Sequence, residues 1–487
     1  MSPSSRLPAV VIVGGGISGL AAAFFLRDRG VAVTVLEGSP RLGGKLTVSE
    51  VGGVAVDEGA EALLARRPEG TALIGAVGLA GRLEDPGTTA AGIWSRGRLH
   101  PLPKRQFMGV PADLDELRAS GILSDAGLAR ARDDLRLPVT PRDGDVPVAG
   151  YVGARFGGEL VDRLVDPLLG GVYAGRSDGL SFEATLGGLA AASLQHRSLA
   201  EAAESLLPAP GTAGGPAAAA RPVFTTLSGG LGTLPPAVAA RCGAAVRTGA
   251  MARELARTAI ADGEGWRITV GPARAPERLD ADAVILAVPA RPASRLLDAV
   301  PGAAAAASAL GEIDYASMAI VTLAYPAGAF PSRPEGSGYL VPAVDGRTVK
   351  AVTFSTVKWP HLRSGDAGLE IVRCSVGRIG EEAVLQRDDA ELARVAAAEL
   401  AAATGVRGEP ADVRVSRWGG ALPQYAVGHV GRVERIRASV AALPGLAVCG
   451  AAYDGVGIPA CIASARLAAD QVIAYLGSRD PRPAHVG

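Results

Sequence analysis

The sequence predicts an α/β protein in which a Rossmann-type domain carries an inserted α+β domain with a mixed sheet and a separate helical domain. Three observations predict this fold class. Residues 9–36 contain two apolar strand-like runs separated by a glycine-rich turn and an apolar helix. The same order of strand, glycine turn and helix returns at residues 446–475, so we expect the Rossmann-type domain to be discontinuous. The 487 residues exceed what one compact core accommodates, which predicts two or three domains.

The expected elements of the first half fall into two groups. We expect a strand at Ala9–Val13, a helix at Ser18–Arg29 and a strand at Val31–Leu36, because apolar strands separated by a helix suit a parallel sheet buried on both faces. Residues 75–174 carry charged amphipathic segments and predict a mainly helical insertion. Examples of these segments are Asp113–Ser120 and Asp125–Leu135.

The second half follows a low-complexity segment at residues 207–222, which predicts a loop or linker. Its pattern indicates a mixed sheet with a helix. We expect strands at Trp266–Val270, Ala283–Ala287, Met318–Tyr325, Val349–Thr356 and Glu370–Gly377, a turn at Arg274–Leu279, and a helix at Asp388–Ala402.

These elements predict a division of the chain into three domains and a tail. We assign residues 1–52, 225–292 and 420–477 to the Rossmann-type domain, residues 53–74, 175–224 and 293–419 to the inserted substrate-binding domain, residues 75–174 to the helical domain, and residues 478–487 to a tail.

Charge and cysteine usage exclude several classes of protein. Lys+Arg and Asp+Glu both number 49, so the balanced charge argues against broad binding to nucleic acid or anionic membranes. The four cysteines contain no CxxC pair, so we expect no metal site and reduced, buried thiols in a cytoplasmic protein. No stretch approaches the roughly 20 apolar residues that span a bilayer, which predicts a soluble protein with at most peripheral membrane contact.

A glycine fingerprint lies between the first strand and the first helix, as Gly14-Gly15-Gly16-Ile17-Ser18-Gly19. Gly14 permits the tight turn, Gly16 lets the backbone approach a pyrophosphate, and Gly19 allows close packing of helix on strand. The helix N-terminus then offers unpaired N–H groups to phosphates. Glu37 ends the second strand, where a carboxylate can accept hydrogen bonds from a ribose. Together these features predict dinucleotide binding.

The segment Arg41-Leu42-Gly43-Gly44-Lys45 favours FAD over NAD as the dinucleotide. Flavoproteins of the amine oxidase superfamily carry an R-x-G-G segment at this place. The paired glycines allow the chain to run close to the cofactor, and Arg41 can meet a phosphate. An ordinary β-turn is the alternative interpretation of this segment.

The C-terminal segment predicts the other end of the same site. We expect a strand at Leu446–Gly450, a loop at Asp454–Pro459 and a helix at Ile462–Tyr475. The N-terminus of this second helix would face a flavin ring, whose reduced form carries negative charge.

From residue 10 to about residue 473 the chain resembles the protoporphyrinogen/coproporphyrinogen oxidase family, FAD enzymes of haem biosynthesis within the amine oxidase superfamily. The resemblance to the Gram-positive coproporphyrinogen III oxidases is the strongest. Its motifs stand in the family's order, as Leu102–Lys104 (LPK), Met108–Pro111 (MGVP), Asp166–Gly175 (DPLLGGVYAG), Leu227–Leu234 (LSGGLGTL), Lys358–His361 (KWPH), Trp418–Gly419 with Ala421–Tyr425 (ALPQY), and Gly455–Pro459 (GVGIP).

The resemblance implies a set of FAD-binding residues and a helical domain that faces the membrane in some members. The residues are Gly14, Gly15, Gly16, Ile17, Ser18, Gly19, Glu37, Gly38, Arg41, Gly43, Gly44, Lys45, Gly59, Ala60, Glu61, Ala62, Met251 (through its backbone), Trp418, Gly450, Val456, Gly457 and Ile458. Three positions depart from the family pattern. Met251 stands for a valine, Ala460 for an acid, and Glu61 for part of a Gly-Pro pair, and the last change puts the local flavin contact in doubt.

The chemistry implied by the resemblance is the removal of six electrons and six protons from a porphyrinogen. A bridging carbon would deliver hydride to the flavin, and O₂ would reoxidise it and give H₂O₂, three times over. The sequence names no catalytic base. His100, His196, His361 and His429 each admit a structural role, and His485 lies in the tail.

Propionate groups on such a substrate need cations at the pocket. The candidates are Arg66, Arg67, Lys104, Arg105 and Arg176, and a solvated surface charge is the alternative for each.

The substrate stays open between coproporphyrinogen III, which we favour, and protoporphyrinogen IX. The absence of a membrane-anchoring stretch agrees with the first, which carries four propionates. A flavin amine oxidase and a non-catalytic FAD-binding scaffold are the alternatives from other classes. Partners implied are the porphyrinogen, O₂ and the next enzyme of the haem pathway.

Overall fold

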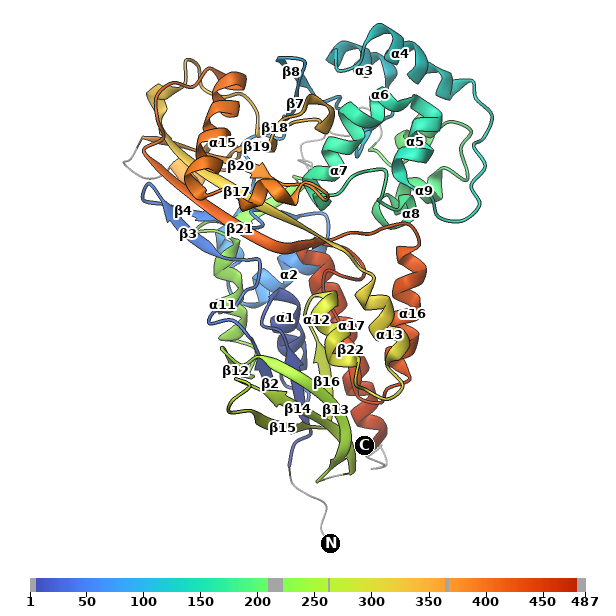
Figure 1. Ribbon diagram of the computed structural model, residues 1–487, viewed down its shortest axis with the longest axis vertical. Helices are drawn as coiled ribbons and strands as arrows, with labels where there is room; N and C mark the ends of the chain where they lie inside the picture. Colours follow the sequence, from blue (N-terminus) through green and yellow to red (C-terminus); the bar gives the residue numbers. More distant parts are fainter. Residues whose placement is uncertain (1–5, 209–221, 262, 364–367, 480–487) are drawn as a thin grey trace.

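The computed structural model describes residues 6–208, 222–261, 263–363 and 368–479. The helices and strands form three bodies that lie against one another (Figure 1). A Rossmann-type sheet with its helices forms the lower half of the view, a larger mixed sheet crosses the upper left, and a group of short helices occupies the upper right. The predicted α/β fold class is confirmed.

The Rossmann-type body is a five-stranded parallel sheet built from the two ends and the middle of the chain. Its strands, in spatial order, are β12 (Ala245–Arg247), β2 (Ala32–Leu36), β1 (Ala9–Val13), β16 (Ala283–Leu286) and β22 (Leu446–Val448). These strands are short and mostly buried, as expected for a parallel sheet covered on both faces.

Helices and a small sheet cover the two faces. On one face α1 (Ile17–Leu26) and α17 (Ile458–Arg479) pack together in one apolar core, with α2 (Pro68–Ala76) and α11 (Leu234–Ala239) beside them. The other face packs on a second core formed by α12 (Ala290–Leu297), α13 (Ala304–Gly311), α16 (His429–Ala441) and the antiparallel strands β13 (Ala252–Ile260), β14 (Gly263–Val270) and β15 (Glu277–Ala281).

The larger sheet has seven strands and is antiparallel except where β18 pairs with β7. Its strands, in spatial order, are β21 (Asp412–Pro423), β17 (Tyr315–Pro326), β20 (Leu369–Val376), β19 (Val349–Phe354), β18 (Gly338–Leu340), β7 (Gly92–Ser95) and β8 (Arg98–Pro101). Helix α15 (Asp389–Thr404) packs on this sheet through a third core. The helix α14 (Ser355–Lys358) follows β19 directly.

The helical body has a core of its own. Its helices are α3 (Leu114–Ser120), α4 (Asp125–Ala131), α5 (Val148–Phe156), α6 (Gly158–Leu160), α7 (Asp166–Tyr173), α8 (Phe182–Thr185), α9 (Gly187–Ala192) and α10 (Leu199–Ser205). A fully buried ion pair ties it together, because Arg155 bonds Asp134 at 2.5 Å while Asp134 also accepts the backbone N–H groups of Leu199 and Ala200.

Short strands join these bodies. They are β3 (Val48–Val51) paired with β4 (Val54–Asp57), β9 (Gln106–Phe107) paired with β10 (Val110–Pro111), and β11 (Phe224–Leu227) between β5 (Leu63–Leu64) and β6 (Leu83–Glu84).

Most predicted elements are present, and several boundaries differ. The turn predicted at Arg274–Leu279 is wrong in its second half, because β15 begins at Glu277 and pairs with β14. The strand predicted at Val349–Thr356 ends at Phe354, where α14 begins. The final helix starts at Ile458, before the predicted Ile462. The segment 207–222 lies almost wholly outside the described residues.

The three-domain division stays a prediction, and two segments lie elsewhere than it expects. Strands β7 and β8, within the predicted helical residues 75–174, belong to the seven-stranded sheet. Helices α8 to α10, within residues 175–224, pack in the core of the helical body. Within the described residues, none of the helices has the length and apolar character needed to cross a membrane.

Candidate functional site

The glycine fingerprint forms a tight loop between β1 and α1. Gly14 has φ +113°, and a side chain there would lie 2.5 Å from the carbonyl oxygen of Ala287. A side chain at Gly19 would collide with the carbonyl of Gly14, so the helix packs directly on the loop. In contrast, nothing lies within 4 Å of the corresponding position at Gly16, which caps α1 without a side-chain hydrogen bond. The space beside Gly16, at the N-terminus of α1, is therefore open, which fits the approach of the phosphates of a dinucleotide to this helix end.

The carboxylate of Glu37 is fixed beside this loop. Its Oε2 accepts the N–H of Gly15 at 2.8 Å, and its Oε1 accepts the N–H of Ser39 at 2.8 Å. A carboxylate has about four lone-pair sites, so both oxygens can still accept a ribose hydroxyl. The backbone bonds set the orientation of the carboxylate, which is a role that the sequence did not predict.

The segment Arg41–Lys45 crosses in front of the glycine loop. Gly43 donates its N–H to the carbonyl of Gly15 at 2.9 Å and forms an isolated parallel bridge with Gly16. Burial lowers the pKa of Lys45. The guanidinium of Arg41 lies 6.0 Å from the ring of Trp418, so the structure brings these two predicted residues together across the chain.

The next predicted segment, Gly59–Ala62, lies against Lys45 and Trp418. A side chain at Gly59 would collide with the carbonyl of Lys45 and would lie 3.3 Å from the Trp418 ring. The Trp418 indole donates to the carbonyl of Glu58 at 2.9 Å. Ala60 is exposed and Ala62 is half-buried. Residues from β21, from the loop before β5 and from the loop after β2 thus form one continuous surface.

Glu61 does not leave its carboxylate free. Lys358 donates to Oε1 at 2.7 Å, and Arg373 donates to Oε2 through Nη1. Arg373 also donates through Nη2 to the carbonyl of Gly59 at 2.6 Å. Burial alone would raise the pKa of Glu61, but the two cations and their hydrogen bonds lower it to about 2.

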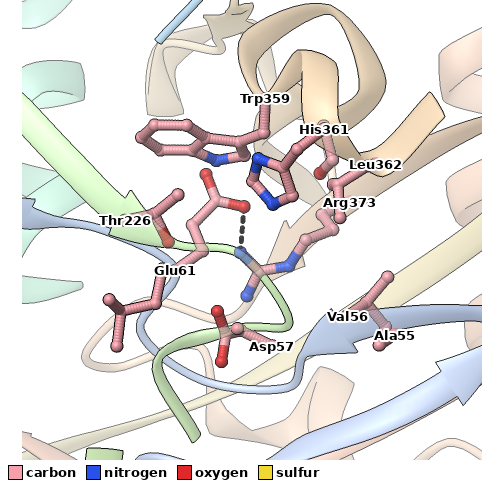
Figure 2. Close-up of a pocket in the computed structure, with 12 residues that line it drawn as sticks. Ala55, Val56, Asp57, Glu61, Thr226, Trp359, His361, Leu362 and Arg373 are labelled. Atoms are coloured by element: carbon pink, nitrogen blue, oxygen red, sulfur yellow. Dashed lines mark hydrogen bonds and ion pairs between the residues drawn. The ribbon is translucent and has the colours of Figure 1, made fainter. Parts of the chain in front are cut away.

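A small, partly open cavity lies beside this cluster. In Figure 2 the Glu61 carboxylate points toward Trp359 and His361, with the Arg373 guanidinium below it and Asp57 beyond. Asp57 accepts the N–H groups of Leu231 and Gly232 at 2.9 Å each. Burial raises the pKa of Asp57 to about 6 despite these bonds. The lining residues are Ala55, Val56, Asp57, Glu61, Thr226, Leu227, Gly230, Ser355, Trp359, His361, Leu362 and Arg373.

The loop before α17 lies beside the start of α1. Gly450 donates to Ser464 at 3.1 Å, and a side chain at Gly450 would lie 3.8 Å from the hydroxyl of Ser18. Val456 packs against the core of the helical body, Gly457 is exposed, and Ile458 begins α17. These contacts bring the two helix N-termini to the same side of the Rossmann-type body.

Two aromatic side chains hold this loop. The hydroxyl of Tyr425 donates to the carbonyl of Ala451 at 2.6 Å, and Nε2 of His429 lies 3.2 Å from the carbonyl of Tyr453. The two rings stack with their centroids 3.9 Å apart. Burial lowers the pKa of His429 to about 4, so the ring is neutral near pH 7.

The glycine loop 14–19, Glu37 and the segment 41–45 together form a surface that we call the cradle. Met251 lies beside Gly38, next to this cradle. A side chain at Gly38 would lie 2.6 Å from the Met251 methyl, and the Met251 carbonyl accepts the N–H of Gly271 at 2.9 Å. The Met251 side chain is half exposed. A backbone contact of Met251 with the cofactor stays a prediction, and its carbonyl already has one partner.

The five predicted substrate cations have different surroundings. Arg105 is held by Glu204 of α10 and by the Pro208 carbonyl, so its guanidinium serves the helical body. Arg67 pairs with Glu69 at 2.8 Å, and Arg176 lies 3.8 Å from Asp178. Arg66 and Lys104 are exposed.

The cysteines and His100 have structural surroundings. The four cysteines are buried and free, as expected: Cys242, Cys374, Cys449 and Cys461. His100 lies 3.1 Å from the Ser120 carbonyl. Across the described ranges, no group of His, Cys, Asp and Glu has the arrangement to hold a metal ion.

Sequence reasoning missed Asp57, Lys358 and Arg373 as residues of this surface. Lys358 was noted only as part of a motif. Glu61 was predicted as an FAD-binding residue and as a departure from the family pattern, but its two cationic partners were not predicted. Arg373 carries no local signal, because it lies within an ordinary strand.

The chain is similar to known flavoproteins over nearly its full length. A family model described as "Flavin containing amine oxidoreductase" matches residues 17–473. The coproporphyrinogen III oxidase of Mycobacterium tuberculosis is 39% identical, covering 97% of this chain and 98% of the relative. That of Bacillus subtilis is 31% identical, covering 96% and 98%. A crystal structure from Exiguobacterium sp. 255-15, provisionally assigned as a protoporphyrinogen oxidase, has a TM-score of 0.82 at 31% identity and covers 97% of this chain and 99% of that one. These likenesses and the cradle give FAD as the cofactor.

Proposed function

Because the chain belongs to the flavin containing amine oxidoreductase family, we propose that it oxidises coproporphyrinogen III to coproporphyrin III in haem biosynthesis. The reaction removes six electrons, with O₂ as the acceptor and H₂O₂ as the second product. The observation that carries the proposal is the full-length likeness to the mycobacterial and Bacillus coproporphyrinogen III oxidases. The proposal includes a cytoplasmic location and delivery of the porphyrin to the next enzyme of the haem pathway.

The residues of this chain fit the cofactor at three places. The open N-terminus of α1 at Gly16 would bind the diphosphate, and Glu37 would orient the ribose. The surface formed by Lys45, Gly59 and Trp418 would support the flavin end. Bound FAD supplies the acceptor for electrons, and the protein binds and orients the flat substrate.

The substrate preference rests on charge. Coproporphyrinogen III carries four propionates and protoporphyrinogen IX two, so the first requires more cations. Arg66, Arg67, Lys104 and Arg176 remain the candidates for this role, and Arg105 is withdrawn because Glu204 already occupies its guanidinium.

Porphyrin fluorescence tests the proposal. FAD-loaded protein is mixed in air with coproporphyrinogen III or protoporphyrinogen IX, and a heat-killed control measures autoxidation. A clear preference for coproporphyrinogen supports the proposal. Fluorescence from FAD-loaded protein that does not exceed the heat-killed control with either substrate would reject porphyrinogen oxidation.

Protoporphyrinogen IX is the second candidate substrate, because the Exiguobacterium structure is assigned to that activity. A preference for it in the same assay would replace coproporphyrinogen. The family description also includes amine oxidation, so H₂O₂ release with primary amines is the matching test. An amine oxidase needs an aromatic cage at the flavin. Tyr453 is the aromatic side chain beside the C-terminal loop 454–459, and it is only 3% exposed.

A further inference from the structure

The loop Gly59–Ala62 takes part in an ion cluster that contains more positive than negative charges. It consists of Glu61, Lys358 and Arg373, whose side chains are 14%, 18% and 8% exposed. Two cations share one carboxylate, so the three residues together carry one positive charge. Lys358 comes from the end of α14 and Arg373 from β20, and both belong to the mixed-sheet body.

The cluster is joined to the loop by a backbone bond as well as by charge. Arg373 uses Nη1 for Glu61 and Nη2 for the Gly59 carbonyl, so one guanidinium holds two points of the loop. Gly59 in turn abuts the Lys45 carbonyl and the Trp418 ring. Arg373 is therefore connected to the surface formed by Lys45 and Trp418 through a single residue, Gly59.

The surroundings keep the charge of the cluster effective. Lys358 lies 5.1 Å from the ring of Trp359, and the Trp359 side chain is buried. Asp57 also lines the cavity, where it accepts the backbone N–H groups of Leu231 and Gly232. It interacts electrostatically with Arg373, and its pKa is raised to about 6 by burial, so its negative charge offsets part of the positive charge of the cluster above that pH. Buried charges are poorly screened by water and salt, so they act over longer distances than surface charges.

We propose that Glu61, Lys358 and Arg373 are positioning residues for FAD: Arg373 holds the loop Gly59–Ala62 against the cofactor, and the excess positive charge of the cluster raises the reduction potential of the flavin. Reduction of a flavin adds negative charge, and a nearby fixed positive charge stabilises the reduced form. The proposal rests on FAD as the cofactor and not on the identity of the substrate.

Two variants with opposite effects on charge test the electrostatic part. Glu61→Gln removes the negative charge and should raise the midpoint potential of bound FAD. Lys358→Met removes one positive charge, leaves the Glu61–Arg373 pair intact, and should lower it. Measured against a redox dye at a fixed potential, the ratio of reduced to oxidised flavin should change about fivefold in each direction.

The control is Asp280→Asn, which removes a negative charge from the exposed pair of Arg267 on β14 and Asp280 on β15. It should leave the potential unchanged. A merely structural cluster would shift both test variants in the same direction or not at all, and either result would overturn the proposal. If Glu61→Gln does not fold, Lys358→Met alone tests the electrostatic part. The proposal then requires a lower midpoint potential of bound FAD in Lys358→Met, and an unchanged or higher potential would overturn it.

Arg373→Lys tests the positional part. Lysine keeps the charge but replaces a planar fork with a single ammonium group, which cannot reproduce both bonds. FAD affinity, measured by release of flavin fluorescence, should fall about tenfold while the potential of the bound flavin changes less than in Lys358→Met. Unchanged affinity would overturn this part. None of these measurements uses a porphyrinogen, so they can fail while the proposed function stands, and the reverse also holds.

Discussion

The two ends of the cofactor surface are built in different ways. At the glycine loop, Gly15, Glu37 and Gly43 interact within a short stretch of the chain, and most of these contacts involve backbone atoms. Ala287 is a distant neighbour of Gly14 at the same loop. At the ion cluster, Glu61 meets partners 297 and 312 residues further along the chain, through side chains alone. A local backbone cradle depends on the absence of side chains, whereas the cluster depends on a balance of charges. The two ends should therefore respond differently to substitution.

The largest effects are expected in the cradle. Gly16→Ala places a methyl group in open space, so the protein should fold with an unchanged melting temperature. The same methyl occupies the approach of the diphosphate, and FAD affinity should fall at least about 100-fold, roughly 2.7 kcal/mol. Flavin absorbance after gel filtration and a thermal melt of the apoprotein check both points.

Gly75→Ala is the matched control for this change. Gly75 lies within α2, and a side chain there would also meet nothing within 4 Å. This variant should bind FAD normally. Equal FAD affinity in Gly16→Ala and Gly75→Ala would show that the diphosphate does not approach the loop at Gly16.

The next largest effect is the pH dependence of stability that arises from two carboxyl groups at the ion cluster, those of Asp57 and Glu61. The pKa of Asp57 is raised to about 6 by burial, so its contribution to stability is present at low pH and is lost as pH rises through 6. Burial opposes ionisation of Glu61, but its two cations outweigh this effect and lower its pKa to about 2. The contribution of Glu61 to stability is therefore present above the usual pKa of a glutamate and is lost as the pH falls toward 2.

Asp57→Asn should remove the first dependence. Between pH 4 and pH 7 the free energy of unfolding of the wild-type protein should fall by on the order of 3 kcal/mol relative to the variant. Urea unfolding at a series of pH values measures the difference. Parallel profiles for the two proteins would contradict a raised pKa at Asp57.

A smaller effect is expected from Glu37→Gln. The amide can accept with only one oxygen, so one of the N–H groups of Gly15 and Ser39 loses its acceptor. FAD affinity should fall about tenfold, close to 1.4 kcal/mol. Isothermal titration with FAD measures this, and an affinity equal to that of the wild type would mean that Glu37 does not shape the site.

The smallest effect is expected at the substrate side. Arg66→Ala or Arg67→Ala should raise the apparent KM for coproporphyrinogen about threefold and leave FAD bound, because each is a single exposed or partly paired cation. Steady-state kinetics with both variants check this. Unchanged kinetics in both would remove these residues from the substrate site.

The comparison also explains which features were predictable from the sequence. The cradle could be predicted because the strand, the glycine spacing and Glu37 lie close together in the chain. Hydrophobic periodicity predicted eight of the 22 strands that the described residues form, and the long strands β13 and β21 were missed. Strands β7 and β8 were placed in a helical segment because β7 joins the sheet through β18, and this pairing connects residues 247 positions apart, such as Ile93 and Leu340. Such pairings leave no local pattern.

Ion pairs between residues far apart in the chain could not be predicted from the sequence either. Arg105 was predicted as a ligand for a propionate, but in the structure it pairs with Glu204. Glu61 was predicted as an FAD-binding residue that departs from the family pattern, and in the structure its carboxylate pairs with Lys358 and Arg373. Charged residues in a sequence show that partners are needed, and only the fold identifies them.

Anaerobic mixing of FAD-loaded protein with coproporphyrinogen III tests the central claim most directly. The cradle, the ion cluster and the substrate cations are proposed to serve one oxidation, so the visible absorption of oxidised flavin should bleach without air as the porphyrinogen loses its first two electrons. Porphyrin absorption should appear only after air is admitted, because the full oxidation needs the flavin to be reoxidised and reduced again until six electrons are removed. Admission of air should restore the flavin spectrum and produce H₂O₂. A protein that binds FAD and keeps its oxidised spectrum in the presence of this porphyrinogen would contradict the account.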